Sequence, residues 1–308
     1  MKIFRGIEEY ESDRSACVTT GTFDGVHIGH KKILKQLADQ AKSENQESVL
    51  VTFDPHPRKV LFPDQGGLQL INTLEEKLEL LATSGIDSVI VQPFTHDFSR
   101  TTALSYVRDL LVEKVGMKHL VIGYDHQFGK NREGSIEQLS EFAPIYDFSV
   151  DEIPAQEIDD INISSTKVRY ALMEGNVFEA NTYLGYEFFI SGMVVKGKGR
   201  GREMKIPTAN IEVNDAQKII PMSGVYSVGV SVNGENYDGL LNIGMNPTFG
   251  DNDTPSIEVH ILDFQEDIYG QSIRVFFRDR IRDEIKFESK EDLLKQINID
   301  IESSKKSL

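Results

Sequence analysis

The chain has 308 residues, about twice the length of a typical domain, so two domains with substantial cores are expected. Hydrophobic residues make up 39% of the sequence and charged residues 27%, and no apolar run reaches 18 residues, which indicates a globular protein without a membrane span. The formal charge of −16 disfavours nucleic acid as a partner, because binding a polyanion by counterion release requires a basic surface.

The N-terminus and the cysteine content indicate where the protein works. The first residues, MKIFRGIEEYESDR, lack the apolar stretch and the cleavage site of a signal peptide. Cys17 is the single cysteine, so an internal disulfide is excluded. We therefore expect a cytoplasmic protein whose partners are small molecules.

Short apolar runs alternate with amphipathic segments in the first half of the chain. Strands are predicted at residues 18–20, 49–53, 89–91 and 120–122. Apolar residues recur at helical spacing between them, at Ile33, Leu34, Leu37, Ala38 and Ala41 and again at Leu104, Val107, Leu110, Leu111 and Val115. This pattern predicts a Rossmann-like α/β domain with a parallel sheet covered on both faces. Ligands of such sheets bind at the carboxyl ends of the strands, which are followed here by the loops after Thr20, Phe53 and Ile122.

The pattern changes after a helix that carries Val168, Ala171 and Leu172. Strands are predicted at residues 188–195, 228–232, 240–243, 257–262 and 273–277, with a hairpin turn at Asn233-Gly234. Short strands at this spacing favour an antiparallel β-barrel or sandwich, covered by a final helix at residues 290–301. We expect domains at residues 1–184 and 185–308.

The loop after the first predicted strand has the sequence GTFDGVHIGH (residues 21–30). Its glycines allow a ligand to approach the backbone, and the helix that follows offers free amides and a positive dipole end. His27 and His30 flank this strand-to-helix turn. A lone histidine or glycine would more simply belong to the turn or the core, but the combination at the end of a parallel strand favours a phosphate site.

This segment resembles the HxGH signature of the nucleotidyltransferase superfamily. The resemblance implies that His27 and His30 are catalytic: they hydrogen-bond nucleotide phosphates and stabilise charge while the α-phosphorus is attacked in line. It implies no protein nucleophile, because such catalysis consists of positioning and electrostatics.

Three further segments lie where this interpretation expects them: TFDPHP (residues 52–57), GYDHQFG (residues 123–129) and ISSTKVR (residues 163–169). Taken alone, the first is a proline-containing turn and the third is a helix cap, although hydroxyls at a helix start with a nearby Arg also describe a triphosphate clamp. Together the segments resemble the flavin adenylyltransferase branch of the superfamily. The resemblance implies flavin binding by His56, Pro57 and Phe128. It implies nucleotide binding by Gly21, Phe23, Asp24, Gly25, Gly29, Asp125, Ser164, Ser165, Thr166 and Arg169.

The second half contains a loop rich in glycine and cations, GKGRGR (residues 197–202), followed by PTAN (residues 207–210). Such a loop can wrap phosphates, and a Thr hydroxyl with an Asn carbonyl oxygen suits Mg²⁺. Glu258 and His260 alternate with apolar residues on a predicted strand, so a carboxylate on the open face could accept a proton from a substrate hydroxyl. Taken alone, the loop is a basic hairpin tip and Glu258 a solvated strand residue.

These segments, with GVY (residues 224–226), NIG (242–244), PTFG (247–250) and DIYG (267–270), resemble riboflavin kinase. The resemblance implies Mg²⁺ ligands at Thr208 and Asn210, a catalytic base at Glu258, and flavin binding by Tyr226 and Arg282. It implies ATP binding by Gly197, Lys198, Gly199, Arg200, Gly201 and Arg202. One position departs from the family pattern, because Lys205 stands where a glycine is usual.

From Gly21 to about Asp300 the chain resembles the family of bifunctional bacterial riboflavin kinases and FAD synthetases. The resemblance implies two Mg²⁺-dependent reactions of ATP, first riboflavin to FMN in the barrel and then FMN to FAD and pyrophosphate in the α/β domain. Two alternatives remain open at this point: a riboflavin kinase whose first domain has a weak or different adenylyltransferase activity, and a non-catalytic flavin-binding regulator. The presence of His27, His30 and Glu258, which only turnover requires, argues against the regulator.

Overall fold

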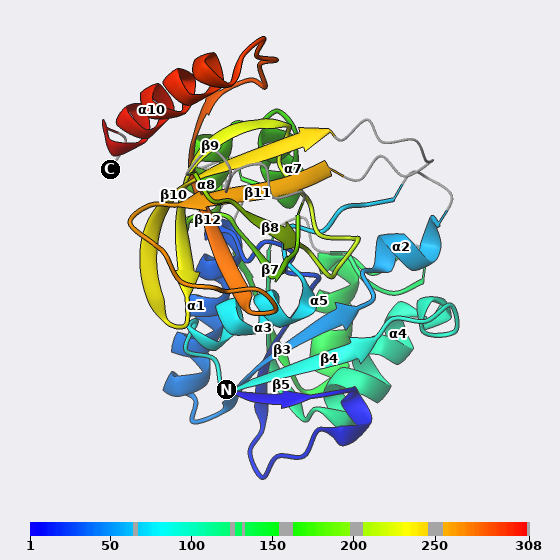
Figure 1. Ribbon diagram of the computed structural model, residues 1–308. Helices are drawn as coiled ribbons and strands as arrows, with labels where there is room; N and C mark the ends of the chain where they lie inside the picture. The colour runs from blue at the N-terminus through cyan, green and yellow to red at the C-terminus, as the bar shows by residue number, and fades with distance from the viewer. Residues whose placement is uncertain are drawn as a thin grey trace. The chain divides into compact units, whose positions relative to one another are not determined.

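The computed structural model describes residues 1–63, 67–123, 127–130, 133–153, 163–197, 206–245 and 255–306 (Figure 1). The chain divides into two compact units, Met1–Ser165 and Thr166–Leu308. Each unit has its own sheet. The domain boundary expected after residue 184 stays a prediction.

The described residues of the first unit form a six-stranded parallel sheet in the order β1-β4-β3-β2-β5-β6. The strands are β1 (Lys2–Phe4), β2 (Ala16–Thr20), β3 (Glu47–Asp54), β4 (Ser88–Pro93), β5 (Met117–Gly123) and β6 (Ser149–Ile153). The predicted Rossmann-like sheet is therefore confirmed. Sequence analysis missed the two edge strands because β1 has three residues and β6 is largely polar, so neither contains an apolar run.

The strand order reverses at β2, which has β3 on one side and β5 on the other. A reversal of this kind opens a crevice at the carboxyl ends of the strands, where ligands of open α/β sheets bind. The loop that follows β2 carries His27 and therefore lies at this point.

Helices cover both faces of the sheet. They are η1 (Ile7–Glu9), α1 (Ile28–Ser43), α2 (Pro57–Leu61), α3 (Leu74–Ala82), η2 (Phe98–Arg100), α4 (Ala103–Ser105), η3 (Tyr106–Lys114) and α5 (Ile136–Tyr146). Side chains of α1 and α3 pack with Leu50 of β3 on one face, whereas η3 and α5 pack with Val49 and Val51 on the other. Burying one Val or Leu side chain completely stabilises the folded protein by about 1.5–3 kcal/mol. The helix predicted around residues 104–115 is wound as a π-helix over Tyr106–Lys114, which the apolar spacing did not indicate.

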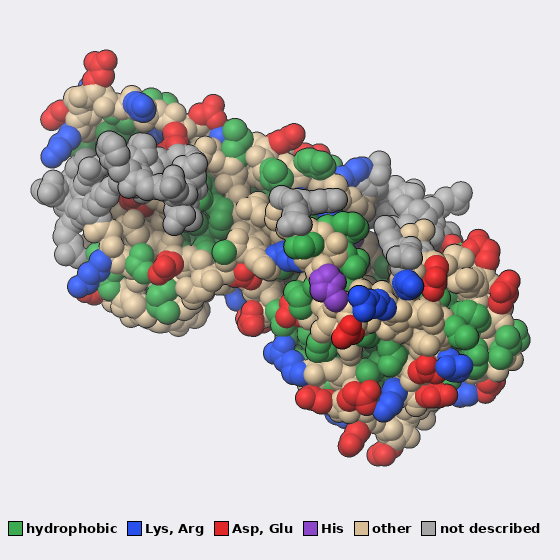
Figure 2. Space-filling view, turned by 90° about the vertical axis from the view of Figure 1, so that its right-hand side faces the viewer, with side chains coloured by type: hydrophobic (Ala, Val, Ile, Leu, Met, Phe, Trp, Pro, Cys, Tyr) green, Lys and Arg blue, Asp and Glu red, His purple; other side chains and the backbone are tan. Residues whose placement is uncertain are grey.

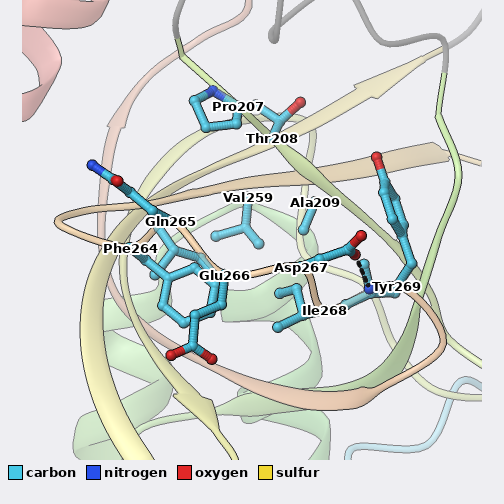
Figure 3. Close-up of a pocket in the computed structure, with 12 residues that line it drawn as sticks. Pro207, Thr208, Ala209, Val259, Phe264, Gln265, Glu266, Asp267, Ile268 and Tyr269 are labelled. Atoms are coloured by element: carbon cyan, nitrogen blue, oxygen red, sulfur yellow. Dashed lines mark hydrogen bonds between the residues drawn. The ribbon is translucent and has the colours of Figure 1, made fainter.

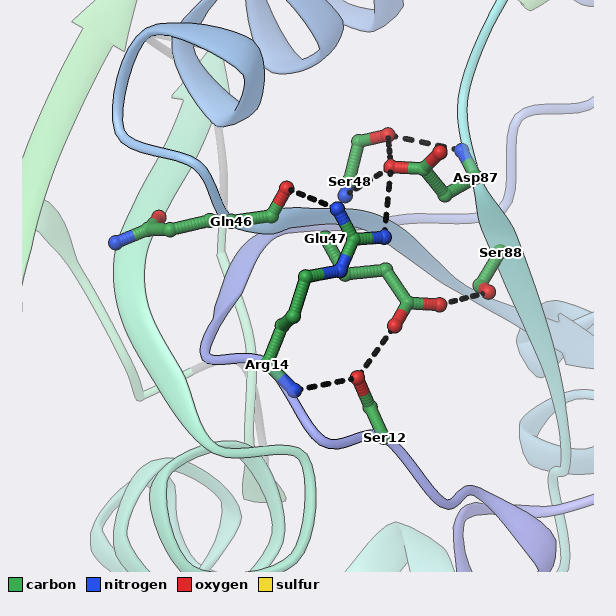
Figure 4. A network of polar contacts seen from close by, with 7 residues as sticks. All are labelled: Ser12, Arg14, Gln46, Glu47, Ser48, Asp87 and Ser88. Atoms are coloured by element: carbon green, nitrogen blue, oxygen red, sulfur yellow. Dashed lines mark hydrogen bonds and ion pairs between the residues drawn. The ribbon is translucent and has the colours of Figure 1, made fainter.

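A polar network ties together the amino ends of β3 and β4, opposite the edge where His27 lies (Figure 4). Glu47 is only 2% exposed, and its carboxylate accepts hydrogen bonds from the hydroxyls of Ser12 and Ser88. Asp87 accepts hydrogen bonds from the backbone N–H and the hydroxyl of Ser48, at 3.0 and 2.9 Å. Because a buried carboxylate is costly unless it is hydrogen-bonded, these hydrogen bonds stabilise the amino ends of β3 and β4.

The second unit is a closed antiparallel barrel in the order β10-β11-β8-β7-β12-β9. The strands are β7 (Phe189–Val195), β8 (Ala209–Glu212), β9 (Gly224–Val232), β10 (Glu235–Met245), β11 (Pro255–Ile261) and β12 (Ser272–Arg282). The structure thus decides between the predicted barrel and sandwich. The hairpin predicted at Asn233-Gly234 joins β9 to β10, and both residues have a positive φ, as a tight turn of this kind requires.

Three helices accompany the barrel strands in the described part of this unit: α7 (Ser165–Met173), α8 (Val177–Leu184) and α10 (Lys290–Lys306). Asn181 of α8 joins its helix to the barrel, because its side chain donates to the carbonyl of Phe277 at 2.8 Å and accepts from the N–H of Phe188 at 2.7 Å. The final helix extends to Lys306, beyond the predicted end at residue 301, and contacts β10 and β12.

Acidic and basic side chains are interspersed on the face seen in Figure 2. Among the helices that the structure describes, none is both long and apolar enough to cross a membrane.

Candidate active sites

The turn between β2 and α1 brings together the two histidines singled out in the sequence. His27 is the N-cap of α1, and its Nδ1 atom accepts the backbone N–H of His30 at 3.3 Å. The two imidazole rings stack with centroids 3.6 Å apart and planes inclined by 17°. Phe23 also contacts His30, with ring centroids 4.6 Å apart and planes inclined by 32°. His30 therefore contacts two aromatic rings at the start of a helix, where backbone amides attract anions.

The environment of His30 keeps its imidazole neutral. Burial, followed by the charges of His27 and Lys77, holds the pKa of His30 well below the usual value of 6.5. Its Nδ1 atom is buried and has no hydrogen-bond partner among the described residues. A neutral imidazole offers one donor and one acceptor, so His30 can donate a hydrogen bond to a ligand but does not supply a positive charge.

The loop around His27 is unusual in its backbone and firmly held. Phe23, Gly25 and Val26 have φ values of 48°, 88° and 37°. Asp24 is 5% exposed, and its carboxylate accepts the backbone N–H groups of Ile71 and Asn72 at 3.1–3.3 Å. The backbone carbonyl of Asp24 accepts the Ser165 hydroxyl at 2.8 Å. These contacts show what Asp24 does within the protein, which is to hold the loop in shape.

The other residues expected to serve this site lie in several environments. Gly21 donates its N–H to the carbonyl of Val51, and a Cβ at Gly21 would come within 3.0 Å of the Phe23 ring. His56 is the N-cap of α2, where Nδ1 accepts the N–H of Arg58 at 3.2 Å, and Pro57 begins that helix.

Phe128, expected to bind flavin, is 8% exposed and packs in the core beside Tyr106, with ring centroids 5.9 Å apart. Gly29 lies in the first turn of α1, and Ser164 directly precedes α7, which carries Ser165, Thr166 and Arg169. Asp125 lies outside the described residues.

Sequence analysis missed Lys77, on α3. Its side chain is buried, and its Nζ donates to the carbonyl of Thr22 at 3.2 Å and to the Thr52 hydroxyl at 3.0 Å. The signal was present, because Lys77 occupies the same helical face as Leu74, Leu78 and Leu81. A lysine on the buried face of a helix is rare in proteins unless it has partners.

The barrel brings the expected kinase residues together on β8 and β11. Thr208, just before β8, donates its hydroxyl to the Glu258 carboxylate at 3.1 Å. Asn210 lies opposite Glu258 in the strand register, so their side chains share one face. Gly197 is packed so closely that a Cβ there would fall 2.1 Å from the Asn210 side-chain nitrogen, which explains the glycine. The remaining residues of the expected nucleotide loop, Lys198, Gly199, Arg200, Gly201 and Arg202, lie outside the described residues, as does Lys205.

A cavity of about 290 Å³ opens beside this group. Its polar wall contains Thr208, Glu258 and Arg282. Its apolar wall contains Ile285, Phe287, Leu293 and Ile297, the last two on α10. The combination of an apolar lining with a carboxylate and a guanidinium suits an aromatic ligand that carries a hydroxyl chain.

A second cavity, of about 330 Å³, adjoins Thr208 (Figure 3). Its lining includes Val194, Phe264, Ile268 and Tyr269. Asp267 accepts the backbone N–H of Tyr269 at 3.1 Å and so shapes the turn beside it. Thr208, the residue that contacts Glu258, lines both cavities.

Tyr226, expected to bind flavin, is placed differently. Its side chain is fully buried, its hydroxyl donates to the carbonyl of Met222, and its ring packs edge-on against Phe277. Its neighbour Val225 lines the cavity instead. The structure thus brings Thr208, Asn210, Glu258 and Arg282 together but places the Tyr226 side chain in the core.

Comparisons with known proteins match the two halves of the chain to two different family models. A family model described as FAD synthetase matches residues 9–167, and one described as riboflavin kinase matches residues 184–308. The chain is 38% identical over 289 residues to the bifunctional riboflavin kinase/FMN adenylyltransferase of Listeria monocytogenes, covering 94% of this chain and 91% of that protein. It is 37% identical over 300 residues to the protein of the same name from Escherichia coli K12, with 96% and 95% coverage.

A crystal structure from Streptococcus pneumoniae, described as a macrolide-efflux protein, has 32% sequence identity and a TM-score of 0.90 over 98% of both chains. The similarity in sequence and in fold thus extends over both units. The chain belongs to the family of bifunctional riboflavin kinases/FMN adenylyltransferases.

Proposed function

We propose that this chain phosphorylates riboflavin at the barrel and adenylylates the resulting FMN at the turn after β2, with one active site for each reaction. The observation that carries the proposal is that each unit gathers its own set of reactive side chains. Glu258 contacts Thr208 beside a cavity in the second unit, and His27 stacks on His30 in the first.

In the kinase reaction the Glu258 carboxylate acts as the base. It takes the proton of the ribityl 5′-hydroxyl while that oxygen forms a bond to the γ-phosphorus of ATP and the bond from phosphorus to the ADP oxygen breaks. The isoalloxazine ring occupies the cavity lined by Phe287, Leu293 and Ile297, with Arg282 at its edge. The nucleotide occupies the second cavity, which shares its lining residue Thr208 with the cavity beside Glu258.

The donor set around Thr208 fits Mg²⁺. The Thr208 hydroxyl and the Asn210 side-chain carbonyl are hard oxygen donors on the same edge of the barrel as Glu258. These two residues would hold the ion together with the ATP phosphates, and when bound it neutralises phosphate charge.

In the adenylyltransferase reaction the histidine pair acts on the nucleotide phosphates. A phosphate oxygen of FMN attacks the α-phosphorus of ATP, and the bond to the bridging oxygen of pyrophosphate breaks. His30 donates a hydrogen bond as a neutral imidazole, and amides at the start of α1 bind the phosphate oxygens. The reaction requires positioning and donors rather than a covalent intermediate, in agreement with the absence of Ser and Cys from the GTFDGVHIGH segment.

Two points about the setting remain proposals. We propose that the enzyme works in the cytoplasm, which is supported by the buried free thiol of Cys17. We also propose that nucleic acid is not a partner, which the net charge of −16 supports.

Product analysis tests the proposal. Purified protein supplied with riboflavin, ATP and Mg²⁺ should accumulate FMN and then FAD on a chromatogram, and protein supplied with FMN should release pyrophosphate as FAD appears. Failure to form either flavin nucleotide would overturn the proposal. Tight flavin binding without consumption of ATP would instead support the non-catalytic alternative, which the two matching family models do not favour.

A further inference from the structure

Lys77 is a buried cation of the first unit that has no role in the adenylyltransferase mechanism proposed above. Its residue exposure is 7%, although lysine is among the residues least often buried. Placing an ammonium in a protein interior costs several kcal/mol before its partners compensate. Lys77 is therefore expected to do something that an apolar residue on α3 would not.

The contacts of Lys77 join the loop after β2 to the end of β3. Its Nζ donates to the carbonyl of Thr22, in the loop after β2, and to the hydroxyl of Thr52, near the end of β3. The Thr52 hydroxyl in turn donates to the same carbonyl at 3.1 Å. Three polar groups from three separate segments thus form a closed triangle. Two of the three N–H groups of the ammonium have partners within the described residues.

The carbonyl that Lys77 holds lies directly before the strained part of the loop. Phe23, Gly25 and Val26 all have positive φ values, and non-glycine residues adopt such values only where surrounding contacts impose them. Lys77 fixes the backbone on one side of Phe23, and the Asp24 carboxylate fixes the other side through Ile71 and Asn72. With the carbonyl of Thr22 drawn toward Lys77, the conformation that places His27 at the N-cap of α1 is stabilised.

The charges around the site point in the same direction. Burial lowers the pKa of Lys77 from 10.5 to about 8, although the charges of Asp24 and Asp54 favour the ammonium form. The charge of Lys77 is also near enough to His30 to disfavour protonation of that imidazole. Lys77 is thus a cation beside His30, whose imidazole stays neutral.

From this geometry we propose that Lys77 is a positioning residue of the adenylyltransferase site, which clamps the loop after β2 to β3 and keeps His27 and His30 aligned for the transition state. This inference rests on the adenylyltransferase site proposed above. The alignment of His27 and His30 matters most in the transition state, where negative charge develops on the phosphates. Removal of Lys77 should therefore lower kcat more than it raises the KM for ATP or FMN.

The test uses the full-length protein with Lys77→Met, which fills the space without charge, and Lys77→Ala, which leaves room for propylammonium. With FMN and ATP as substrates, kcat for FAD formation should fall about 100-fold in both variants, as for other losses of a preorganised polar group, while KM changes little. Propylammonium should restore at least about one tenth of the lost rate in Lys77→Ala, but not in Lys77→Met, where the space is filled. Tetramethylammonium, which has the charge but no N–H donor, should restore nothing.

Each preparation contains its own control, because riboflavin kinase activity should remain unchanged in all variants. Lys42→Met, which removes an exposed lysine at the end of α1, should leave both activities unchanged. Wild-type protein that forms FMN but no FAD would count against the proposed adenylyltransferase function itself. With an active wild type, each of three results would overturn the Lys77 proposal. They are a normal kcat in Lys77→Met, a failure of propylammonium to restore any activity, and a first unit that is not folded in the variant at the assay temperature.

Discussion

Asp300 of α10 holds Arg282 of β12 through a bidentate ion pair in the lining of the cavity beside Glu258. Arg282 donates from Nε to both carboxylate oxygens at 3.1 Å and from Nη2 to one of them at 2.8 Å. Asp300 is 1% exposed and also accepts a hydrogen bond from Gln296 at 2.9 Å. A paired guanidinium–carboxylate geometry of this kind fixes the direction of the arginine. The C-terminal helix therefore determines where Arg282 lies relative to the cavity beside Glu258.

Asp300→Asn should reduce riboflavin phosphorylation while leaving adenylylation of supplied FMN unchanged. Loss of the carboxylate leaves the Arg282 charge without its partner, which typically costs about 3–5 kcal/mol for a buried pair. We expect kcat/KM for riboflavin to fall roughly tenfold or more and the thermal unfolding of the second unit to shift downward. Glu291→Gln, at an exposed position of the same helix, is the matched control and should change neither quantity. A normal KM for riboflavin in Asp300→Asn would contradict a role in placing Arg282.

Glu258→Gln should abolish most kinase activity and spare FAD formation from FMN. The amide keeps the shape of the side chain but cannot take the proton of the ribityl hydroxyl, and loss of a general base typically costs about 10²- to 10⁴-fold. Glu212→Gln, which alters an exposed carboxylate on β8, serves as the control. Equal losses in both reactions would argue against separate sites.

His27→Ala and His30→Ala should show the reverse pattern: riboflavin is still phosphorylated, and FMN accumulates without being adenylylated.

The neutral state of His30 predicts how the stability of the first unit depends on pH. Its pKa in the folded protein is lowered by burial first and then by nearby charges, so below pH 6.5 the unfolded chain binds a proton that the folded chain does not. Stability from this group is therefore present above pH 6.5 and is lost as pH falls, by at most about 1.4 kcal/mol per pH unit. Denaturant unfolding of wild type and His30→Asn at pH 7.0, 6.0 and 5.0 measures the difference. If both proteins lose stability in parallel, His30 is not the group responsible.

Cys17 should be unreactive in the folded protein. It is fully buried in β2, and burial raises the pKa of its thiol to about 12, so almost no thiolate exists at pH 8. An aromatic disulfide reagent should label the native protein at least about 100-fold more slowly than the protein unfolded in guanidinium chloride. Rapid labelling without denaturant would show that β2 opens far more readily than its central position in the sheet indicates.

The architecture was largely predictable because it follows from short-range patterns. The apolar runs that became β2, β3, β4 and β5 were legible because buried parallel strands are continuously apolar, and the alternation in β9 because one of its faces lies in the barrel core. The edge strands β1 and β6 were not predicted, because they are extended through pairing with β4 and β5 and not because of their own composition.

The sequence by itself determined which residues are available for chemistry: a histidine pair after the first central strand, Thr208 and Asn210 in one motif, and Glu258 in another. These lie in motifs whose spacing along the chain already sets their local geometry. Only the tertiary structure decided which side chains face a site and in what charge state. Lys77 meets Thr22 across 55 positions and Asp300 meets Arg282 across 18, while Tyr226 and Phe128 turn into cores that distant segments complete. Burial and electrostatic environment depend on residues remote in the chain, so no local pattern contains them.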